Sequence, residues 1–242
     1  QTFTQKLFHR LLEWDVNPPP AAQVWTDKLH AKERAGSVLG PGHTAKLYWK
    51  GAEPRDIPFG ELPLPHVIKA RHGSRMNLVA REDLDQMEVI QQCSAWMQRN
   101  YYDHAREGQY RRLTKGLIIE ECLQNSDGSP VLDYKFWCFH GRPIMVHVDN
   151  PDQSINPFYD MGWDLLDLHY RKDCPRPRLD RPANFDAMRE MAAQLALCWD
   201  FVRVDLFSVN DRPYFSEMTF TPNAGGMHFL PEHWDTTLGN YW

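Results

Sequence analysis

The chain has 242 residues, which is enough for one large domain or two small ones. Hydrophobic residues make up 42% of it and charged residues 24%, as is usual for a soluble globular protein. The formal net charge of −5 argues against a general nucleic-acid binder. No apolar run is long enough to span a bilayer, and the first residues show no signal-peptide pattern.

The cysteines are odd in number and lie far apart in the sequence. This spacing disfavours a disulfide framework and a zinc site of the Cys-x-x-Cys type. We therefore expect buried free thiols in a reducing cytoplasm. The cysteines are Cys93, Cys122, Cys138, Cys174 and Cys198.

Residues 1–65 are predicted to form a helical and irregular N-terminal region. Apolar residues at helical spacing predict a helix over residues 3–14, and the three prolines that follow end it. A second helix is expected over residues 22–34. Residues 36–64 are rich in Gly and Pro and predict an irregular connector with one short strand near residues 47–49.

The pattern then changes to a mixture of strands and helices. Strands are predicted over residues 66–70 and 76–80, joined by a turn, and a helix is predicted over residues 81–99. Residues 117–123 predict a mostly buried strand. Together these elements indicate a first α+β unit over residues 66–122.

A second α+β unit is predicted over residues 123–242. It opens with a hairpin whose strands cover residues 133–139 and 144–148. Residues 150–181 form a long excursion, and a loop of this length is usually functional. It is either a solvated loop or a receptor for an anionic acceptor, because it carries many basic residues. These are Arg171, Lys172, Arg176, Arg178 and Arg181.

A helix predicted over residues 185–198, with Asn184 as its N-cap, leads into the central stretch of this unit. Residues 201–219 are rich in β-branched and aromatic residues on both sides of an Asn-Asp pair. This composition predicts a β-hairpin. The tail over residues 220–242 is expected to be mostly irregular.

Two carboxylates stand in this hairpin. If its loop comprises residues 210–212, Asp205 lies directly opposite Glu217, with Cβ atoms about 5 Å apart. Like charges that close destabilise a sheet unless a cation lies between them, and Mg²⁺ suits this place because it prefers oxygen ligands. If the loop comprises only residues 210–211, the register slips by one and Glu217 points to the other face. The alternative to a metal site is a hairpin with two solvated acids.

Arg203 lies two residues before Asp205, so both side chains occupy the same face of the strand. A guanidinium in this place is positioned to stabilise a transferring phosphoryl group. The alternative is that Arg203 simply neutralises Asp205 or Glu217.

Lys69 ends a predicted strand and is followed by a turn that contains Gly73 and Ser74. A lysine in this position suits a phosphate contact, with the backbone amides of the turn closing over the phosphates. The alternative is a lysine on an exposed strand face beside an ordinary turn. No P-loop or dinucleotide-binding glycine motif occurs in the chain.

Charged residues also mark two other predicted strands. Glu120 and Glu121 follow three apolar residues, where the strand either presents its backbone to an adenine edge or ends in solvated acids. Asp133 and Lys135 face the same way on their strand. They either bind a ribose hydroxyl and a phosphate or form an ion pair with each other.

In this order, the features resemble the ATP-grasp superfamily. The branch they resemble is that of the teichuronopeptide-synthesis (TupA-like) ATP-grasp proteins of bacterial surface-polysaccharide gene clusters. The resemblance covers most of the chain, and its Asp-Tyr-Lys-Phe and Glu-x-Thr-Phe-Thr-Pro pieces are specific in combination. The segments that carry it are residues 2–6, 27–28, 67–69, 118–121, 133–139, 201–206, 217–222 and 238–239.

The resemblance implies an ATP-grasp fold of the α+β class, in which two α+β subdomains hold ATP between them. It also implies that Asp205, Glu217 and Thr219 bind Mg²⁺ and that Arg203 and Lys69 serve catalysis. Thr219 stands where many ATP-grasp proteins carry Asn. The nucleotide contacts that the resemblance implies are Lys28, Lys69, Gly73, Ser74, Glu120, Glu121, Cys122, Leu123, Asp133 and Lys135.

The function that this resemblance implies is an ATP-dependent carboxylate–amine ligase. In such enzymes the γ-phosphoryl group moves to a carboxylate, and an amine attacks the resulting acyl phosphate. The polysaccharide link suggests a uronic acid or a related glycan as the carboxylate. Two alternatives remain. One is a kinase for a small molecule or sugar, and the other is a nucleotide-binding partner of a glycan assembly complex without chemistry.

Overall fold

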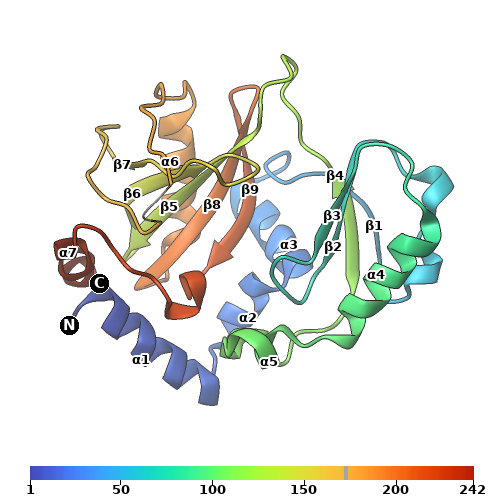
Figure 1. Cartoon of the computed structure of the whole chain (residues 1–242), viewed down its shortest axis with the longest axis horizontal. Coiled ribbons are helices and arrows are strands. Elements are labelled where there is room, and N and C mark those ends of the chain that lie inside the picture. The colour runs from blue at the N-terminus through green and yellow to red at the C-terminus, as the bar shows by residue number, and fades with distance from the viewer. Residues whose placement is uncertain (172–173) are drawn as a thin grey trace.

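The computed structural model describes residues 1–171 and 174–242 and arranges the chain around two antiparallel sheets (Figure 1). The first sheet has the strand order β1-β4-β2-β3, and the second has the order β7-β6-β5-β8-β9. Helices accompany both sheets, so the predicted α+β class is confirmed. The strands of the first sheet are β1 (Leu47–Gly51), β2 (His66–Ala70), β3 (Asn77–Ala80) and β4 (Leu117–Glu121). The strands of the second sheet are β5 (Leu132–Phe139), β6 (Arg142–Asp149), β7 (Phe158–Asp160), β8 (Phe201–Val209) and β9 (Arg212–Thr219).

The first sheet separates an apolar face from a charged one. Ile68 and Ala70 of β2 are buried in one apolar cluster with Val89 and Trp96 of α4 (Gln86–Gln98). Lys69 lies between them in the sequence, so its side chain points to the opposite face. The apolar residues therefore fix the face on which Lys69 lies.

Helix α4 begins at Gln86 and not at residue 81, where the sequence pattern places its start. The Asp85 carboxylate accepts hydrogen bonds from the amides of Met87 (2.8 Å) and Glu88 (3.0 Å), and it forms the N-cap. Strand β1 pairs with β4 and thus belongs to the first sheet, although it lies in the expected N-terminal region. The division of the chain at residue 65 stays a prediction.

The second sheet also has two different faces. Tyr134, Phe136 and Cys138 of β5 point into an apolar layer that includes residues of three helices, which are α2 (Pro20–Thr26), α3 (Lys28–Leu39) and α6 (Phe185–Ala196). Asp133 and Lys135 alternate with them and point to the other face. This second face carries the polar residues of the candidate site.

The hairpin of β8 and β9 has a two-residue turn, since Val209 pairs with Arg212. Asp205 nevertheless pairs with Glu217, because a β-bulge between Leu206 and Asp205 shifts the register back. Our expectation that a two-residue turn would send Glu217 to the other face is therefore wrong. The extra residue of the bulge is Ser216, which lies between Phe215, paired with Leu206, and Glu217.

The predicted helix over residues 22–34 is two helices. They are α2 (Pro20–Thr26) and α3 (Lys28–Leu39), and both follow α1 (Phe3–Val16). Asp27 separates them because its backbone is extended and its carboxylate accepts hydrogen bonds from the amides of Leu29 (3.0 Å) and His30 (3.3 Å). This N-cap starts α3 in a new direction and places Lys28 in its first turn.

The segments between β1 and β2, between α4 and β4, and after β9 contain short helices that the sequence did not indicate. The tail, expected to be mostly irregular, contains α7 (His233–Tyr241). Asn184 precedes α6 but does not cap it, because its amide donates instead to the Ser208 hydroxyl (3.0 Å). The other short helices are α5 (Tyr101–Ala105), η1 (Pro54–Asp56), η2 (Phe59–Glu61), η3 (Gly108–Tyr110) and η4 (Pro222–Gly225).

All five cysteines are free, as expected, but the expectation that they are buried is right only for Cys93 and Cys138, and Cys198 is exposed. Among the helices of the described residues, none combines the length and the apolar character that a membrane span requires.

Phe3 anchors the N-terminal helix to the second sheet and to the C-terminal segment. Its side chain has no exposed surface. Figure 1 shows that the two ends of the chain lie close together beside this sheet. Five aromatic rings surround Phe3, with centroid distances between 4.8 and 6.1 Å. They are Trp137, Phe139, Phe201, Phe229 and Trp242.

Replacing the Phe3 ring should weaken the packing of α1 against the second sheet. We expect Phe3→Ala to lower the free energy of unfolding by about 3–5 kcal/mol, because the cavity it leaves lies inside a close-packed aromatic cluster. Phe8 lies on the same helix and is 59% exposed, so Phe8→Ala should change it by less than about 0.5 kcal/mol. Urea unfolding of both variants measures the difference. Equal losses for the two variants would contradict the anchoring role of Phe3.

Candidate active site

A cleft of about 510 Å³ lies between the charged faces of the two sheets. Strands β2, β3 and β4 form one wall, and strands β5, β6 and β9 contribute to the other. Most of the predicted site residues line this cleft. They are Lys28, Lys69, Glu120, Glu121, Cys122, Leu123, Asp133, Lys135 and Glu217. Gly73, Ser74, Arg203, Asp205 and Thr219 do not belong to the lining.

Glu120, on the first wall, forms ion pairs with two lysines. Lys69 forms an ion pair with its Oε1, and Lys32 forms one with its Oε2 at 2.7 Å. Burial opposes ionisation of Glu120, but the charges of Lys69 and Lys32 lower its pKa. Glu120 is thus not the solvated acid of the alternative interpretation. Lys32 was not predicted from the sequence, although it lies one helical turn after Lys28 on α3.

Lys28 connects the start of α3 to the turn after β2. Its Nζ donates a hydrogen bond to the Gly73 carbonyl (2.5 Å), and Tyr101 packs against Gly73 from the other side. Burial lowers the pKa of Lys28, while the carboxylate of Glu217 raises it. The structure therefore brings Lys28 and Glu217, which are far apart in the sequence, into electrostatic contact across the cleft.

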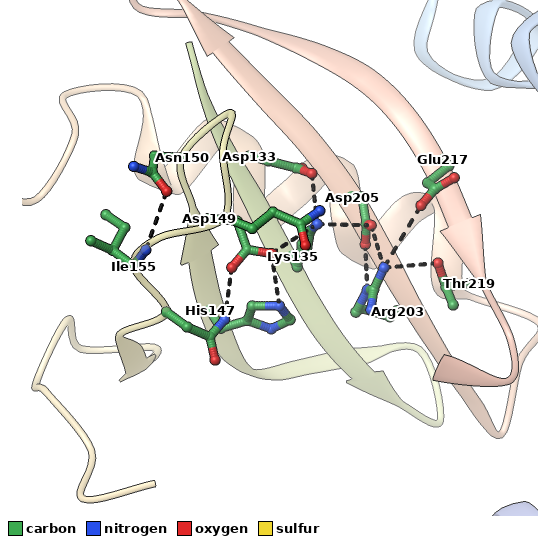
Figure 2. A network of polar contacts seen from close by, with 12 residues as sticks. Asp133, Lys135, His147, Asp149, Asn150, Ile155, Arg203, Asp205, Glu217 and Thr219 are labelled. Carbon is green, nitrogen blue, oxygen red and sulfur yellow. Dashed lines mark hydrogen bonds and ion pairs between the residues drawn. The ribbon is translucent and has the colours of Figure 1, made fainter. Parts of the chain in front are cut away.

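One row of side chains crosses the second sheet at the bottom of the cleft (Figure 2). His147 pairs with Lys135, Lys135 with Asp205, and Asp205 with Glu217. Directly opposed residues share a face, so the four side chains point the same way. Arg203 and Thr219 form a neighbouring pair on this face.

The guanidinium of Arg203 lies at the centre of this polar face. It donates to both oxygens of Asp205, at 2.7 and 2.6 Å, and to the Thr219 hydroxyl at 3.0 Å. Its Nη2 also lies 3.7 Å from Oε1 of Glu217. Burial raises the pKa of Asp205, which has no exposed surface, and the charges of Arg203 and Lys135 act against it. Arg203 thus neutralises Asp205, as one of our two interpretations held.

The same oxygens are those expected to hold Mg²⁺. In the part of the chain that the structure describes, no group of three His, Cys, Asp or Glu side chains is arranged to hold a metal ion. The oxygens of Asp205, Thr219 and Glu217 instead converge on the Nη2 atom of Arg203. They are hard oxygen donors of the kind that Mg²⁺ prefers, so their chemistry fits this ion. The assignment of the metal ligands stays a prediction.

Lys135 extends the network toward the long excursion. Its Nζ lies 2.8 Å from Asp133, 3.1 Å from Asp149 and 3.9 Å from Asp205 (Figure 2). The Asp133–Lys135 ion pair is the alternative that the sequence left open. Arg171 of the excursion binds the other oxygen of Asp149 at 2.6 Å.

The basic residues of the excursion have different roles. Arg176 donates to backbone carbonyls of the excursion itself. Arg181 pairs with Asp186 at 2.6 Å, and Arg178 is exposed. Lys172 lies outside the described residues. A role of the excursion in binding an anionic acceptor stays a prediction.

The sequence matches the TupA-like ATPgrasp family over residues 5–242. The chain belongs to this family. The ATP-grasp fold that the resemblance implied is thereby confirmed.

Solved structures with the same fold are distant in sequence. The D-alanine–D-alanine ligase of Helicobacter pylori is 17% identical, with a TM-score of 0.54 over 90% of this chain and 60% of that one. The L-amino acid ligase of Bacillus licheniformis is 14% identical, with a TM-score of 0.53 over 87% and 45%. The D-alanine–D-alanine ligase of Bacillus anthracis complexed with ATP is 16% identical, with a TM-score of 0.50 over 82% and 54%. The ATP-grasp chain therefore spans less than two thirds of their length. No curated protein matches it.

Glu107 is a second residue that the sequence analysis missed. It lies between α5 and η3 and is only 6% exposed. Burial raises its pKa to about 7, although the Thr221 hydroxyl acts in the opposite direction. The sequence around Glu107 does not indicate that this glutamate is buried, because its burial depends on contact with the loop after β9.

The raised pKa of Glu107 makes stability depend on pH. The folded state holds this proton more tightly than the unfolded chain, whose pKa is near the ordinary 4.5. Stability from this group is therefore lost as the pH rises from about 4.5 to about 7, by about 3 kcal/mol in total. Glu107→Gln should remove this loss and raise the free energy of unfolding at about pH 8, but not at about pH 4.

Urea unfolding at several pH values measures this effect. The matched control is Glu190→Gln, because Glu190 is exposed on α6 and its replacement should leave the pH profile unchanged. A Glu107→Gln profile parallel to that of the wild type would show that Glu107 titrates normally.

Proposed function

We propose that this ATP-grasp chain is an ATP- and Mg²⁺-dependent carboxylate–amine ligase that acts through an acyl phosphate. The observation that carries the proposal is the charge arrangement of the cleft. Lys28, Lys32 and Lys69 line the cleft, and Arg203 lies among carboxylates on the polar face of the second sheet. Such an arrangement suits a triphosphate and a transferring phosphoryl group.

The end of β4 would hold the adenine. The amides of Glu121 and Cys122 donate to the carbonyls of Lys46 (2.9 Å) and Pro65 (3.3 Å). The next amide along the chain, that of Leu123, would then meet the adenine edge. Asp133 lines the same cleft and would lie near the ribose.

The lysines and the arginine would position the reacting groups. Lys28, Lys32 and Lys69 would bind and orient the phosphates, and the turn that contains Gly73 and Ser74 would lie beside them. Arg203 would stabilise the negative charge of the transferring phosphoryl group. When bound by Asp205, Glu217 and Thr219, Mg²⁺ would neutralise phosphate charge.

The substrates of the ligase are proposed at the level of chemical class. The solved relatives include ligases of D-alanine and of L-amino acids, so an amino acid or another amine is a suitable nucleophile. The carboxylate would be a uronic acid or related glycan of a bacterial surface polysaccharide, modified in the cytoplasm.

Two measurements test the proposed ligase. Calorimetry with Mg·ADP and with a Mg·ATP analogue should give binding that requires Mg²⁺. ATP with hydroxylamine and a panel of carboxylates (glucuronate, galacturonate, D- and L-alanine, L-glutamate) should give a hydroxamate, because hydroxylamine traps an acyl phosphate. A phosphorylated product that forms without acyl transfer would indicate the kinase, and binding without turnover would indicate the partner without chemistry.

Replacing Glu217 should stop turnover and leave the fold intact. Its side chain is 44% exposed, whereas Asp205 is fully buried against Arg203, so Glu217→Gln is the cleaner test of the metal assignment. We expect ADP release to fall by a factor of about 100 or more, with an unchanged melting temperature. Glu190→Gln is the control, and an unaltered rate in Glu217→Gln would remove the metal assignment.

Replacing Lys32 should weaken nucleotide binding. Its ammonium is 14% exposed and lines the cleft, so Lys32→Ala should raise the Kd for Mg·ATP analogue about tenfold, or about 1.4 kcal/mol. Lys50→Ala is the control, because Lys50 is 56% exposed and lies outside the cleft lining. Equal affinity of the two variants would exclude Lys32 from the phosphate site.

A further inference from the structure

The buried carboxylates of the described residues differ in whether a cationic side chain forms an ion pair with them. Asp27, Glu120, Asp149 and Asp205 each have an ion pair, at 2.8 Å or less. Within residues 1–171 and 174–242, Glu107 is buried without any such partner. A buried carboxylate without a cation is costly, and its retention requires a reason. The partners of the other four are, in the same order, Arg71, Lys32 with Lys69, Arg171 with Lys135, and Arg203.

Glu107 does not belong to the lining of the cleft, but the charges of Glu217 and Arg203 act on its carboxylate. The Thr221 hydroxyl donates to its Oε1, and the Gln109 amide donates to Thr221 (2.7 Å) and, weakly, to the same Oε1 (3.5 Å). Thr221 lies two residues after Thr219, which is the last residue of β9. Both of these contacts use Oε1, and the Tyr101 hydroxyl is a further hydrogen-bonding neighbour of the carboxyl.

Tyr101 joins Glu107 to the phosphate turn. The Tyr101 hydroxyl lies beside the Ser74 side chain and beside the Glu107 carboxyl, and these two contacts alter its pKa in opposite directions. The ring of Tyr101 lies 4.6 Å from that of Tyr110. If residue 73 had a side chain, its Cβ would contact the Cβ of Tyr101. Glu107 therefore stands between the turn that would hold phosphates and the loop that follows the metal-binding hairpin.

The backbone holds Glu107 in this place. A Cβ atom at Gly108 would lie 1.9 Å from the carbonyl oxygen of Trp14, so η3 is pressed against the end of α1. The charged and titratable groups that face the carboxylate are Glu217, Arg203, Tyr101 and Tyr110. Arg203 is already bound to Asp205, so it does not serve as the missing cation.

We propose that the missing cation is the ammonium group of the amine substrate, and that Glu107 binds this group and accepts its proton. This inference rests on the proposed ligase function, since an amine that enters as an ammonium must lose a proton before it can attack. The groups around Glu107, two tyrosines and a threonine, are hydrogen-bonding neighbours that would orient an ammonium without repelling it.

The substrate R–NH₃⁺ transfers one proton to the Glu107 carboxylate and becomes R–NH₂. The nitrogen lone pair then forms a bond to the carbonyl carbon of the acyl phosphate, and the bond between that carbon and the bridging oxygen breaks. Phosphate leaves with the electron pair and takes the second proton from nitrogen, which gives an amide and hydrogen phosphate. Glu107 afterwards releases its proton to water. A pKa near neutrality suits this role.

A comparison of two nucleophiles distinguishes proton acceptance by Glu107 from the other steps of the reaction. Hydroxylamine is largely uncharged near neutral pH and needs no base, whereas glycine enters as an ammonium. Each is supplied with ATP and with the carboxylate that gave a hydroxamate in the screen. We expect Glu107→Gln to form hydroxamate within about twofold of the wild-type rate and to form the glycine amide at least about 100-fold more slowly. Glu107→Asp, which keeps a carboxylate, should recover part of the amide rate.

The outcomes distinguish the two proposals. A wild type without any hydroxamate would contradict the ligase function itself. A wild type that forms hydroxamate, with a Glu107→Gln variant that forms the amide normally, would overturn only the role of Glu107. Equal loss of both reactions in Glu107→Gln would also overturn it, because an amine-specific base does not act on hydroxylamine. Glu190→Gln should behave as the wild type in both reactions.

A measurement without turnover gives an independent test. Carbon-13 NMR of the glutamate carboxyls, with Glu107→Gln to assign the signal, follows the titration of Glu107 while methylammonium is added. Its pKa should fall as the ammonium binds, and tetramethylammonium, which has no proton to donate, should have a smaller effect. An unchanged titration with methylammonium would contradict the ammonium site.

Discussion

The buried contact between Arg203 and Asp205 is the interaction on which the polar face of the second sheet depends. Two acids and a hydroxyl would repel one another or lose hydration at the bottom of the cleft without a cation between them. The guanidinium satisfies both oxygens of Asp205 and still reaches Thr219 and Glu217. A ligand that binds here must therefore rearrange an existing charge network, because the network leaves no bare carboxylate at its centre.

The two walls of the cleft use their charges in different ways. At the first wall, Glu120 holds Lys69 and Lys32 close together, so the positive charges that would bind a triphosphate are kept in place. At the second wall, Arg203 and Lys135 are each surrounded by acids. Preorganisation of this kind lowers the cost of ordering side chains upon binding, which is a general route to affinity and to catalysis.

Much of the fold and of the site could be predicted from the sequence, and the misses have physical reasons. Strands with clear alternation were found, and the shared face of Arg203 and Asp205 followed from their spacing of two residues. Pattern alone could not reveal the bulge at Ser216, because one extra residue leaves no trace in composition. It also could not reveal Lys32 or Glu107. Their roles come from partners about ninety and more than one hundred residues away in the sequence.

The bulge at Ser216 separates the tip of the β8–β9 hairpin from the acidic pair. Beyond the bulge, the strands pair regularly from Leu206–Phe215 to the turn, where Asn210 exchanges hydrogen bonds with Asn125, which lines the cleft, and with Ser126. Residues could be added to both strands of the tip in matched pairs without moving Asp205 or Glu217. The length of the hairpin tip and the geometry of the acidic pair are thus set by separate parts of one hairpin, so either can change while the other is preserved.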